Sequence, residues 1–268
     1  MAKGKHSNSK SRKRRFKIKS KAKIFRLFLI LILIVTVILL IVRLSNRNSA
    51  KNDEEFQQIA NDNFKIQEEN VKTERMLKLE ELQKENSDIV AWLQIEDSNI
   101  NYPILQTTDN SFYMTHNYKK EYSIDGSLFL DKDYDWSIPS SNLLIYGHNN
   151  RGSKEMFVDL LKYKDEEFYN SHKTIRFTTN EEDAEYEIIA VFLSRVYYKS
   201  ETNVFRYYYF INANNEEEFN EYVEESKKAS LYDIEATAKY GDQLLTLSTC
   251  EFSQEDGRFA VVARKIEK

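Results

Sequence analysis

The chain has 268 residues and a single cysteine, Cys250. One cysteine excludes an intrachain disulfide and a cysteine-rich zinc site, and with only four histidines we expect no metal cluster and no cofactor. The apolar content of 41%, rich in Tyr and Phe, is typical of a folded, β-rich protein. The net charge of −4 conceals two parts: residues 1–52 carry fifteen basic side chains and no acidic one, and the remainder carries 24 basic and 43 acidic side chains.

An apolar segment follows the basic N-terminus. Thr36 is the only polar residue of positions 27–42, and the segment extends to positions 24–44. A helix of this length spans about 31 Å, close to the thickness of the apolar layer of a bilayer. The positive-inside rule then predicts a cytoplasmic head, 1–23, one transmembrane anchor, 24–44, and an extracellular remainder at the cell membrane.

Two alternatives for this N-terminal region are less consistent with the sequence. A basic head on an acidic body is also typical of a nucleic-acid-binding tail, but the apolar run that follows it argues against a nucleic-acid partner. A cleaved signal peptide has a shorter apolar region and a small-residue cleavage site, whereas Arg43 to Arg47 reads RLSNR. We therefore predict a single-pass anchor that is retained.

Residues 45–88 are expected to form a helical stalk, because apolar positions in the charged stretch 53–88 recur at helical spacing. Residues 89–268 then form the main domain, in which short apolar or alternating runs predict eight strands and hence a barrel or sandwich. These strands are 100–105, 127–130, 142–146, 174–178, 186–197, 204–211, 243–249 and 258–265.

One long helix is predicted between the sixth and seventh strands. Asn214 and Asn215 are candidate N-cap residues, acidic residues 216–218 fill the first turn, and Lys227 and Lys228 fill the last. This charge order suits the helix dipole. We expect about fifteen helical residues, a length in the usual range for globular proteins.

The residues best placed for chemistry lie at strand ends. Cys250 ends the run 243–250, and Arg258 opens the next strand, so a hairpin would bring the thiol and the guanidinium face to face. Such a cation favours a thiolate or donates hydrogen bonds to an oxyanion. His148 follows the apolar strand 142–146 and is the candidate proton-transfer partner. His116 and His172 lie in polar segments, where we expect them to be solvated.

These motifs resemble those of sortases, the membrane-anchored cysteine transpeptidases of Gram-positive bacteria. The resemblance rests on TLSTC at 246–250, on Arg258 at the start of the last strand and on YGHN around His148. The runs DIVAWLQIE, NYPILQ and DGSLFLD are similar to class B sortases in particular. The resemblance covers about residues 75–266 and implies a closed eight-stranded β-barrel with N-terminal helices.

The resemblance also implies a reaction. Cys250 would be the nucleophile that cleaves a C-terminal sorting signal of the LPxTG or NPxTN kind after Thr, His148 the general acid and base, and Arg258 the oxyanion ligand. The partners would be surface proteins carrying such signals and an amine of a lipid-linked peptidoglycan precursor. The sequence does not distinguish this acceptor from a pilin lysine. Candidate substrate-binding residues are Ser248, Thr249, Glu251, Tyr146, Asn110 and Met114.

A function of another class remains open on the residues alone. A non-enzymatic membrane-anchored adhesin or assembly factor with a β domain would bury Cys250 as an inert thiol. Labelling of the intact ectodomain with a small methanethiosulfonate distinguishes the two, because complete protection of Cys250 until denaturation would count against an enzyme.

Overall fold

The computed structural model describes residues 72–138 and 140–267, together with Thr36, Leu39, Leu40 and Arg43. The predicted basic head, the predicted stalk up to residue 71 and most of the predicted anchor therefore lie outside the described residues. In the part that is described, no helix combines the length and the apolar character that crossing a bilayer requires.

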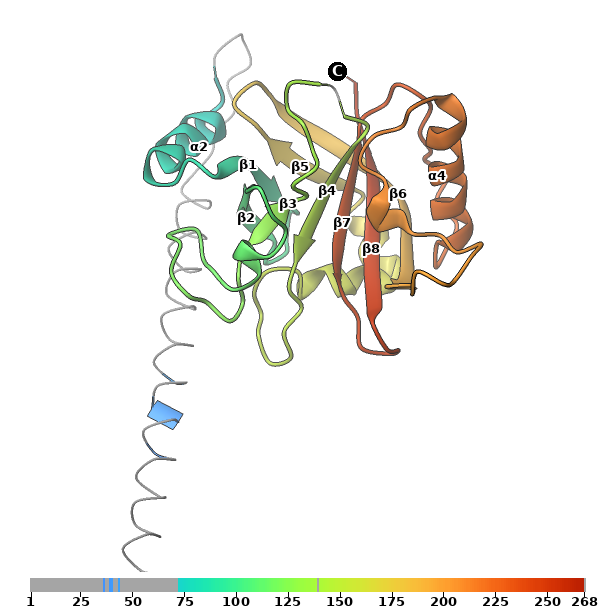
Figure 1. The fold of residues 1–268 in the computed structure, drawn as a ribbon. Coiled ribbons are helices and arrows are strands. Elements are labelled where there is room, and N and C mark those ends of the chain that lie inside the picture. Colours follow the sequence, from blue (N-terminus) through green and yellow to red (C-terminus); the bar gives the residue numbers. More distant parts are fainter. Residues whose placement is uncertain (1–35, 37–38, 41–42, 44–71, 139, 268) are drawn as a thin grey trace, which may run out of the picture. The chain divides into compact units, whose positions relative to one another are not determined.

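Eight strands form a closed barrel in the order β1-β2-β3-β4-β7-β8-β6-β5 (Figure 1). The barrel therefore confirms the predicted mainly-β class. The strands are β1 (Ile89–Gln94), β2 (Asn101–Leu105), β3 (Leu128–Leu130), β4 (Asn142–Gly147), β5 (Thr174–Thr178), β6 (Asp183–Arg195), β7 (Leu244–Cys250) and β8 (Gly257–Lys265).

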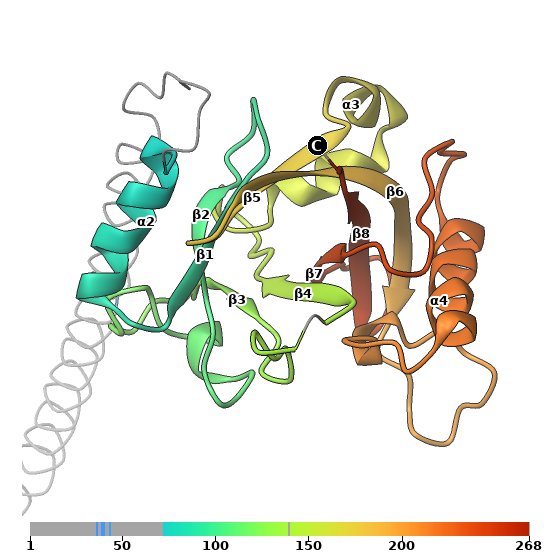
Figure 2. The same cartoon turned by 90° about the horizontal axis from the view of Figure 1, so that it is seen from above.

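Helices and 3-10 turns connect and cover the strands. They are α2 (Glu74–Glu85), η1 (Phe112–Met114), η2 (Asp159–Lys164), α3 (Glu166–Ser171), η3 (Tyr207–Tyr209) and α4 (Glu216–Ala229). Helix α2 lies beside β1 and α4 lies beside β6, on two sides of the barrel (Figures 1 and 2). The side chain of Thr73 caps α2, and the side chain of Asn215 caps α4 by accepting a hydrogen bond from Glu218 N.

The core is divided between the barrel interior and two outer faces. Alternation along each strand places one set of side chains inside, with Leu245 and Leu247 of β7 among them. Leu144 and Leu244 belong to an outer cluster with the α4 side chains Phe219 and Tyr222. The remaining outer cluster packs α2 against β1, β2 and β3. The long helix between the sixth and seventh strands is thus confirmed, and its apolar face covers the outside of the barrel.

One strand of the barrel was not predicted, and one predicted strand is wrong. Residues 89–94 form β1, which was not predicted because α2 covers its outer face and both faces are largely buried, so the sequence shows no polar alternation. Residues 204–211 are not a strand. The barrel is already closed and offers no free edge, so this segment lies over the outer face, with η3 at its centre.

Candidate active site

Cys250 ends a row of three outward-facing polar side chains on β7. The first, Thr246, shares a hydrogen bond of 2.8 Å with the Tyr222 hydroxyl of α4. The second, Ser248, shares one of 2.7 Å with the Tyr207 hydroxyl of η3. Cys250 is the third and is half-buried. The outer layer therefore covers the first two positions of the row and leaves the thiol at its edge.

His148 lies beside Cys250 because β4 and β7 run parallel. Their register pairs Tyr146 with Ser248 and Gly147 with Thr249, so the next residues of the two strands are His148 and Cys250. The Thr249 hydroxyl donates to Gly147 O over 2.7 Å, and Asn149 Nδ2 donates to Cys250 O over 3.0 Å. The first bond strengthens the last pair of the ladder, and the second extends the contact between the strands beyond it. The outer face thus carries Tyr146 and His148 in one row and Ser248 and Cys250 in the next.

A backbone carbonyl orients the His148 ring. Nε2 lies 2.7 Å from Met114 O, and a carbonyl oxygen only accepts hydrogen bonds, so Nε2 carries a proton. The remaining ring nitrogen, Nδ1, is the atom that can gain or lose a proton. The Met114 side chain itself is 44% exposed at the end of η1.

Arg258 opens β8 directly across the hairpin from Cys250. The antiparallel register pairs the two residues, which confirms the predicted hairpin. The α-carbons of such pairs are about 4.5–5.5 Å apart in antiparallel sheets. The guanidinium is half-buried and donates from Nη1 to Gly257 O over 2.9 Å.

Tyr207 reports the electrostatic surroundings of this group. Burial raises the pKa of its hydroxyl well above the usual value, with the Ser248 bond and the Arg258 charge opposing the rise. The charge of Cys250 adds to the rise. The same buried hydroxyl therefore interacts electrostatically with both Arg258 and Cys250. Tyr207 was not predicted as a neighbour of the site, because its segment was predicted to be a strand.

The Glu251 carboxylate is buried and paired with Lys164. Lys164 Nζ donates over 2.6 Å, and Ser253 N donates over 2.8 Å. Burial by itself raises the pKa of Glu251, but these hydrogen bonds outweigh burial and lower the pKa to about 2. Glu251, a candidate substrate-binding residue, is thus held within the protein by an ion pair with a residue of η2. We infer that Glu251 holds the hairpin loop in place.

Two other predicted substrate contacts have their hydroxyls engaged within the protein. Thr249 is 2% exposed and shares its strand face with Leu247 of the barrel interior, while its hydroxyl bonds Gly147 O. Ser248 is equally buried under Tyr207. The prediction for Thr249 is corrected accordingly, because its side chain lies on the strand face opposite to Cys250.

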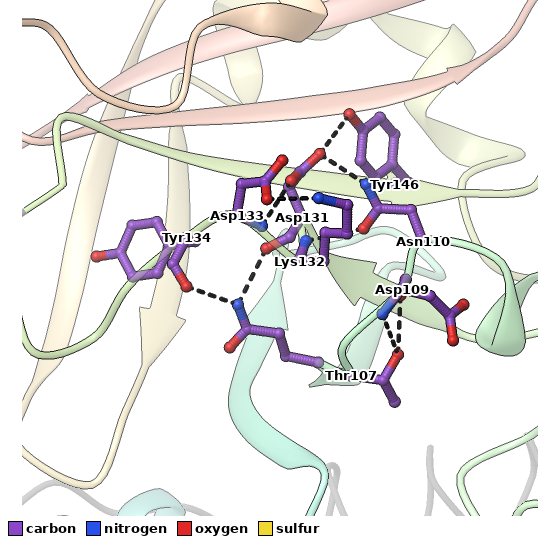
Figure 3. Close-up of polar contacts among 9 residues, drawn as sticks. Thr107, Asp109, Asn110, Asp131, Lys132, Asp133, Tyr134 and Tyr146 are labelled. Carbon is purple, nitrogen blue, oxygen red and sulfur yellow. Dashed lines mark hydrogen bonds and ion pairs between the residues drawn. The ribbon is translucent and has the colours of Figure 1, made fainter.

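Asn110 and Tyr146 come together at one carboxylate. Asn110 Nδ2 and the Tyr146 hydroxyl each donate to Asp131 Oδ2 over 2.9 Å (Figure 3). Burial, and then the charge of Asp131, raise the pKa of Tyr146 well above its usual value. The two candidate residues are therefore neighbours, as expected of groove residues, but both are held by Asp131, for which the sequence suggested no role.

The sequence predicted that His116 and His172 are solvated, but both rings pack against a phenylalanine. His116 stacks on Phe112 and His172 stacks on Phe168, with ring centroids 4.1 and 3.9 Å apart. In each case Nδ1 lies 2.8 Å from the carbonyl oxygen of the same Phe, four residues earlier. Both rings are half-buried and serve local structure, so His148 is the histidine that lies beside the thiol.

The sequence and fold match those of known proteins. The sortase domain family matches residues 93–266. Sortase B of Listeria monocytogenes is 36% identical over 201 residues, which cover 74% of this chain and 78% of the relative. A crystal structure of sortase B from Bacillus anthracis is 30% identical, has a TM-score of 0.68, and is matched over 84% of this chain and 99% of its own. A sortase B complexed with triglycine is 25% identical, has a TM-score of 0.67, and is matched over 84% and 98%.

Family and structural matches agree with the geometry of the Cys250 site. The chain belongs to the sortase family and, within it, to class B, which makes it a cysteine transpeptidase. The non-enzymatic adhesin considered from the residues alone is therefore set aside.

Proposed function

We propose that the enzyme cleaves a C-terminal sorting signal of the LPxTG or NPxTN kind after Thr and transfers the protein to an amine of the cell wall. The observation that carries this proposal is the arrangement on the outer face of the barrel. Cys250 and His148 each come directly after the last paired residues of β7 and β4, so they lie side by side. Arg258 lies opposite the thiol across the hairpin. These groups supply a nucleophile, a proton carrier and an oxyanion ligand at one place.

The acylation step uses all three groups. The Cys250 thiol gives its proton to Nδ1 of His148, and the thiolate Sγ attacks the carbonyl carbon of the Thr residue. N–H groups of Arg258 stabilise the negative charge that develops on the carbonyl oxygen. The C–N bond of the next residue breaks, and His148 gives a proton to the leaving amine. Because Nε2 is bound to Met114 O, Nδ1 is the nitrogen that delivers this proton. The product is a thioester on Cys250.

The second step reverses the proton transfer. An incoming amine attacks the thioester carbonyl, Nδ1 of His148 takes a proton from this amine, and the Cys250 sulfur leaves. A new amide bond forms and the enzyme is regenerated. The solved sortase B complexed with triglycine, a peptide with a free amino group, supports an amine as the acceptor.

We further propose that residues 24–44 anchor the enzyme in the cell membrane, with residues 1–23 inside and the catalytic domain outside. The support is the apolar sequence and the distribution of basic residues. An anchor would hold the enzyme at the surface where a lipid-linked wall precursor and the tail of an exported protein are also held, which raises the effective concentration of all three.

A peptide library tests the reaction. The full-length protein in lipid vesicles is incubated with peptides that vary each position of LPxTG and NPxTN, together with either triglycine or a lysine-bearing peptide, and products are identified by mass. We expect cleavage between Thr and the following residue, with the amine joined to Thr. Cleavage at another position, or no product with any peptide, would contradict the proposed substrate class.

The single cysteine allows a direct test of topology. A membrane-impermeant methanethiosulfonate added to intact cells should label Cys250, and the Cys250→Ala variant should give no label. The matched probe is Ser7→Cys in the Cys250→Ala background, which places one thiol in the predicted cytoplasmic head and should react only after lysis. Labelling of residue 7 in intact cells would reject the proposed orientation.

A further inference from the structure

Asp131 is a buried carboxylate with no role in the proposed chemistry. It follows β3, is 5% exposed, and continues the ladder through a bond of 2.8 Å from its N to Leu144 O. Oδ2 accepts hydrogen bonds from Asn110 and Tyr146, and Oδ1 accepts one of 2.9 Å from Asp133 N. A carboxylate is expensive to bury without such donors. Its position therefore depends on these three bonds.

The two side-chain donors come from different parts of the site. Tyr146 lies on β4, on the same outward face as His148 and in register with Ser248 of the Cys250 strand. Asn110 lies in the loop that leads from β2 to η1. Met114 is the last residue of η1, and its O binds His148. Figure 3 shows Asp131 bonded to both Asn110 and Tyr146. The carboxylate thus links the strand that carries His148 to the loop that orients it.

The Asn110 amide is also fixed from its other end. Its Oδ1 accepts a bond of 2.8 Å from Lys132 N, so both ends of the amide are bound to neighbouring residues of one turn. The contact with Asp131 uses one of the two amide hydrogens. The second hydrogen remains as a donor whose direction Asp131 and Lys132 together define.

The Tyr146 hydroxyl is a fixed donor as well. Its raised pKa means that the hydroxyl keeps its proton throughout the pH range in which the protein functions, so the bond to Asp131 keeps its direction. The ring packs at 5.4 Å, centroid to centroid, against Phe129 of β3. Both contacts hold the ring between the two outer clusters, next to the Ser248 and Cys250 row.

We propose that Asp131 is a positioning residue for substrate recognition: its carboxylate holds the Asn110 amide and the Tyr146 ring in the orientation in which they receive the sorting signal beside Cys250. This inference rests on the proposed function, because it assigns these two residues to the substrate groove. Asp131 itself touches neither the substrate nor the reacting atoms.

Asp131→Asn tests the proposal with little change in size. The amide has one oxygen in place of two and its NH2 group only donates, so the three bonds cannot all be kept: either the bond from Asp133 N is lost, or the NH2 group faces the donors of Asn110 and Tyr146. We expect KM for the sorting peptide to rise about tenfold, the effect of about one hydrogen bond, with kcat changed less than about threefold. The labelling rate of Cys250 by methanethiosulfonate should stay within about twofold, since the thiol is not bonded to Asp131.

Asp133→Asn is the matched control. It makes the same chemical change two residues away in the same turn, at a carboxylate that is exposed and paired with Lys132. Its backbone N still donates to Asp131, so KM should not change. Equal effects of the two variants would overturn the proposal, because they would indicate a general effect of charge in this turn.

A double-mutant cycle with Asn110→Ala separates positioning from stability. If Asp131 acts through Asn110, the double variant should raise KM no more than the larger single effect. Additive effects, an unchanged KM in Asp131→Asn, or a drop in kcat together with slower labelling would each overturn the proposal. If the unmodified protein processes no sorting peptide, the proposed function fails and this inference fails with it; an active protein with an unaffected Asp131→Asn variant rejects this inference alone.

Discussion

At the scale of single residues, the site depends on alternation along two parallel strands. Tyr146 and His148 share the outward face of β4, and Ser248 and Cys250 share that of β7. The outer layer covers Ser248 with Tyr207, whereas Cys250 lies one repeat further and is half-buried. Chemistry is therefore confined to the last residue of the row, where a substrate can approach.

Replacing the three proposed catalytic residues should separate activity from folding. Cys250→Ala should abolish transpeptidation with a melting temperature close to that of the unmodified protein, because the thiol is small and lies at the rim. His148→Ala and Arg258→Ala should each lower turnover at least about a hundredfold, the usual effect of losing a proton carrier or an oxyanion ligand. Steady-state transpeptidation with mass detection measures these rates.

Two substitutions of the same residue types serve as controls. His172→Ala removes a histidine that stacks on Phe168, and Arg264→Ala removes an arginine paired with Glu187, both away from Cys250. Neither should change turnover of the folded protein. Activity of the Cys250→Ala variant above background would refute the assignment of the nucleophile. Near-normal turnover in His148→Ala or in Arg258→Ala would refute the role assigned to that residue.

Glu251 should give the protein a measurable dependence of stability on acid. Its folded-state pKa of about 2 lies below the value of about 4.3 for an unfolded glutamate. The stabilisation is therefore complete above about pH 4.3 and is lost as pH falls towards 2. Glu251→Gln should lower the free energy of unfolding at pH 7, and its difference from the unmodified protein should shrink between about pH 4.5 and about pH 2.5. Urea unfolding across this range measures the difference; a gap that is constant with pH would contradict the assignment to Glu251.

At the scale of elements, the β7–β8 hairpin places Arg258 against Cys250. Gly257 precedes Arg258, and a Cβ at this position would lie 2.3 Å from Glu251 O, a contact with backbone that no rotamer change can relieve. The hairpin closes through a bond of 3.0 Å from Glu251 N to Gly257 O. Glycine at 257 therefore allows the close approach of the two strands at the site.

Gly257→Ala should force the two strands apart and displace Arg258. We expect a loss of about 1–3 kcal/mol in stability, as for other overpacked positions, together with at least about a tenfold drop in turnover. Gly241→Ala is the comparison: its φ of +100° makes alanine strained, but nothing lies within 4 Å and the turn is at the other end of β7. It should lower stability and leave turnover unchanged. Equal losses of turnover in both variants would contradict the role of the hairpin.

Local sequence signals predicted some elements better than others. Helix α4 was predicted because its cap Asn215, its acidic first turn and its basic last turn are all visible in the sequence. Strand β1 was missed because α2 buries its outer face, and the segment of Tyr207 was taken for a strand because its aromatic residues suit one. Both errors arise where packing against a distant element, and not local propensity, decides the conformation.

At the scale of the whole molecule, α2 is joined to the barrel across the β1–β5 pair. Arg75 of α2 is 7% exposed, donates from Nε to Thr178 of β5 over 3.2 Å, and bonds Gln94 of β1. Burial lowers the pKa of its guanidinium to about 10. One side chain thus connects the helix to two strands that are 84 residues apart at Gln94 and Thr178.

Arg75→Ala should destabilise the domain by about 1–3 kcal/mol, because it leaves buried hydrogen-bonding partners unsatisfied. Glu81→Ala, at an exposed position of the same helix, is the matched control and should change stability by less than about 0.5 kcal/mol. Urea unfolding of the full-length variants measures both values. Equal stabilities would show that α2 is held by its apolar contacts alone.

The sequence by itself determined the chemistry of this protein: one thiol at a strand end, a histidine after another strand, an arginine that opens the last strand, and the family that these motifs indicate. These features are local, and a hairpin of known length fixes how Cys250 meets Arg258. Only the tertiary structure placed His148 beside Cys250, since β4 and β7 are separated by 96 residues between Gly147 and Leu244 and pair in parallel. It also decided that Glu251 pairs with Lys164 and that Asp131 holds Asn110 and Tyr146. Such contacts depend on how the barrel closes, and residues far apart in the chain carry no local signal of them.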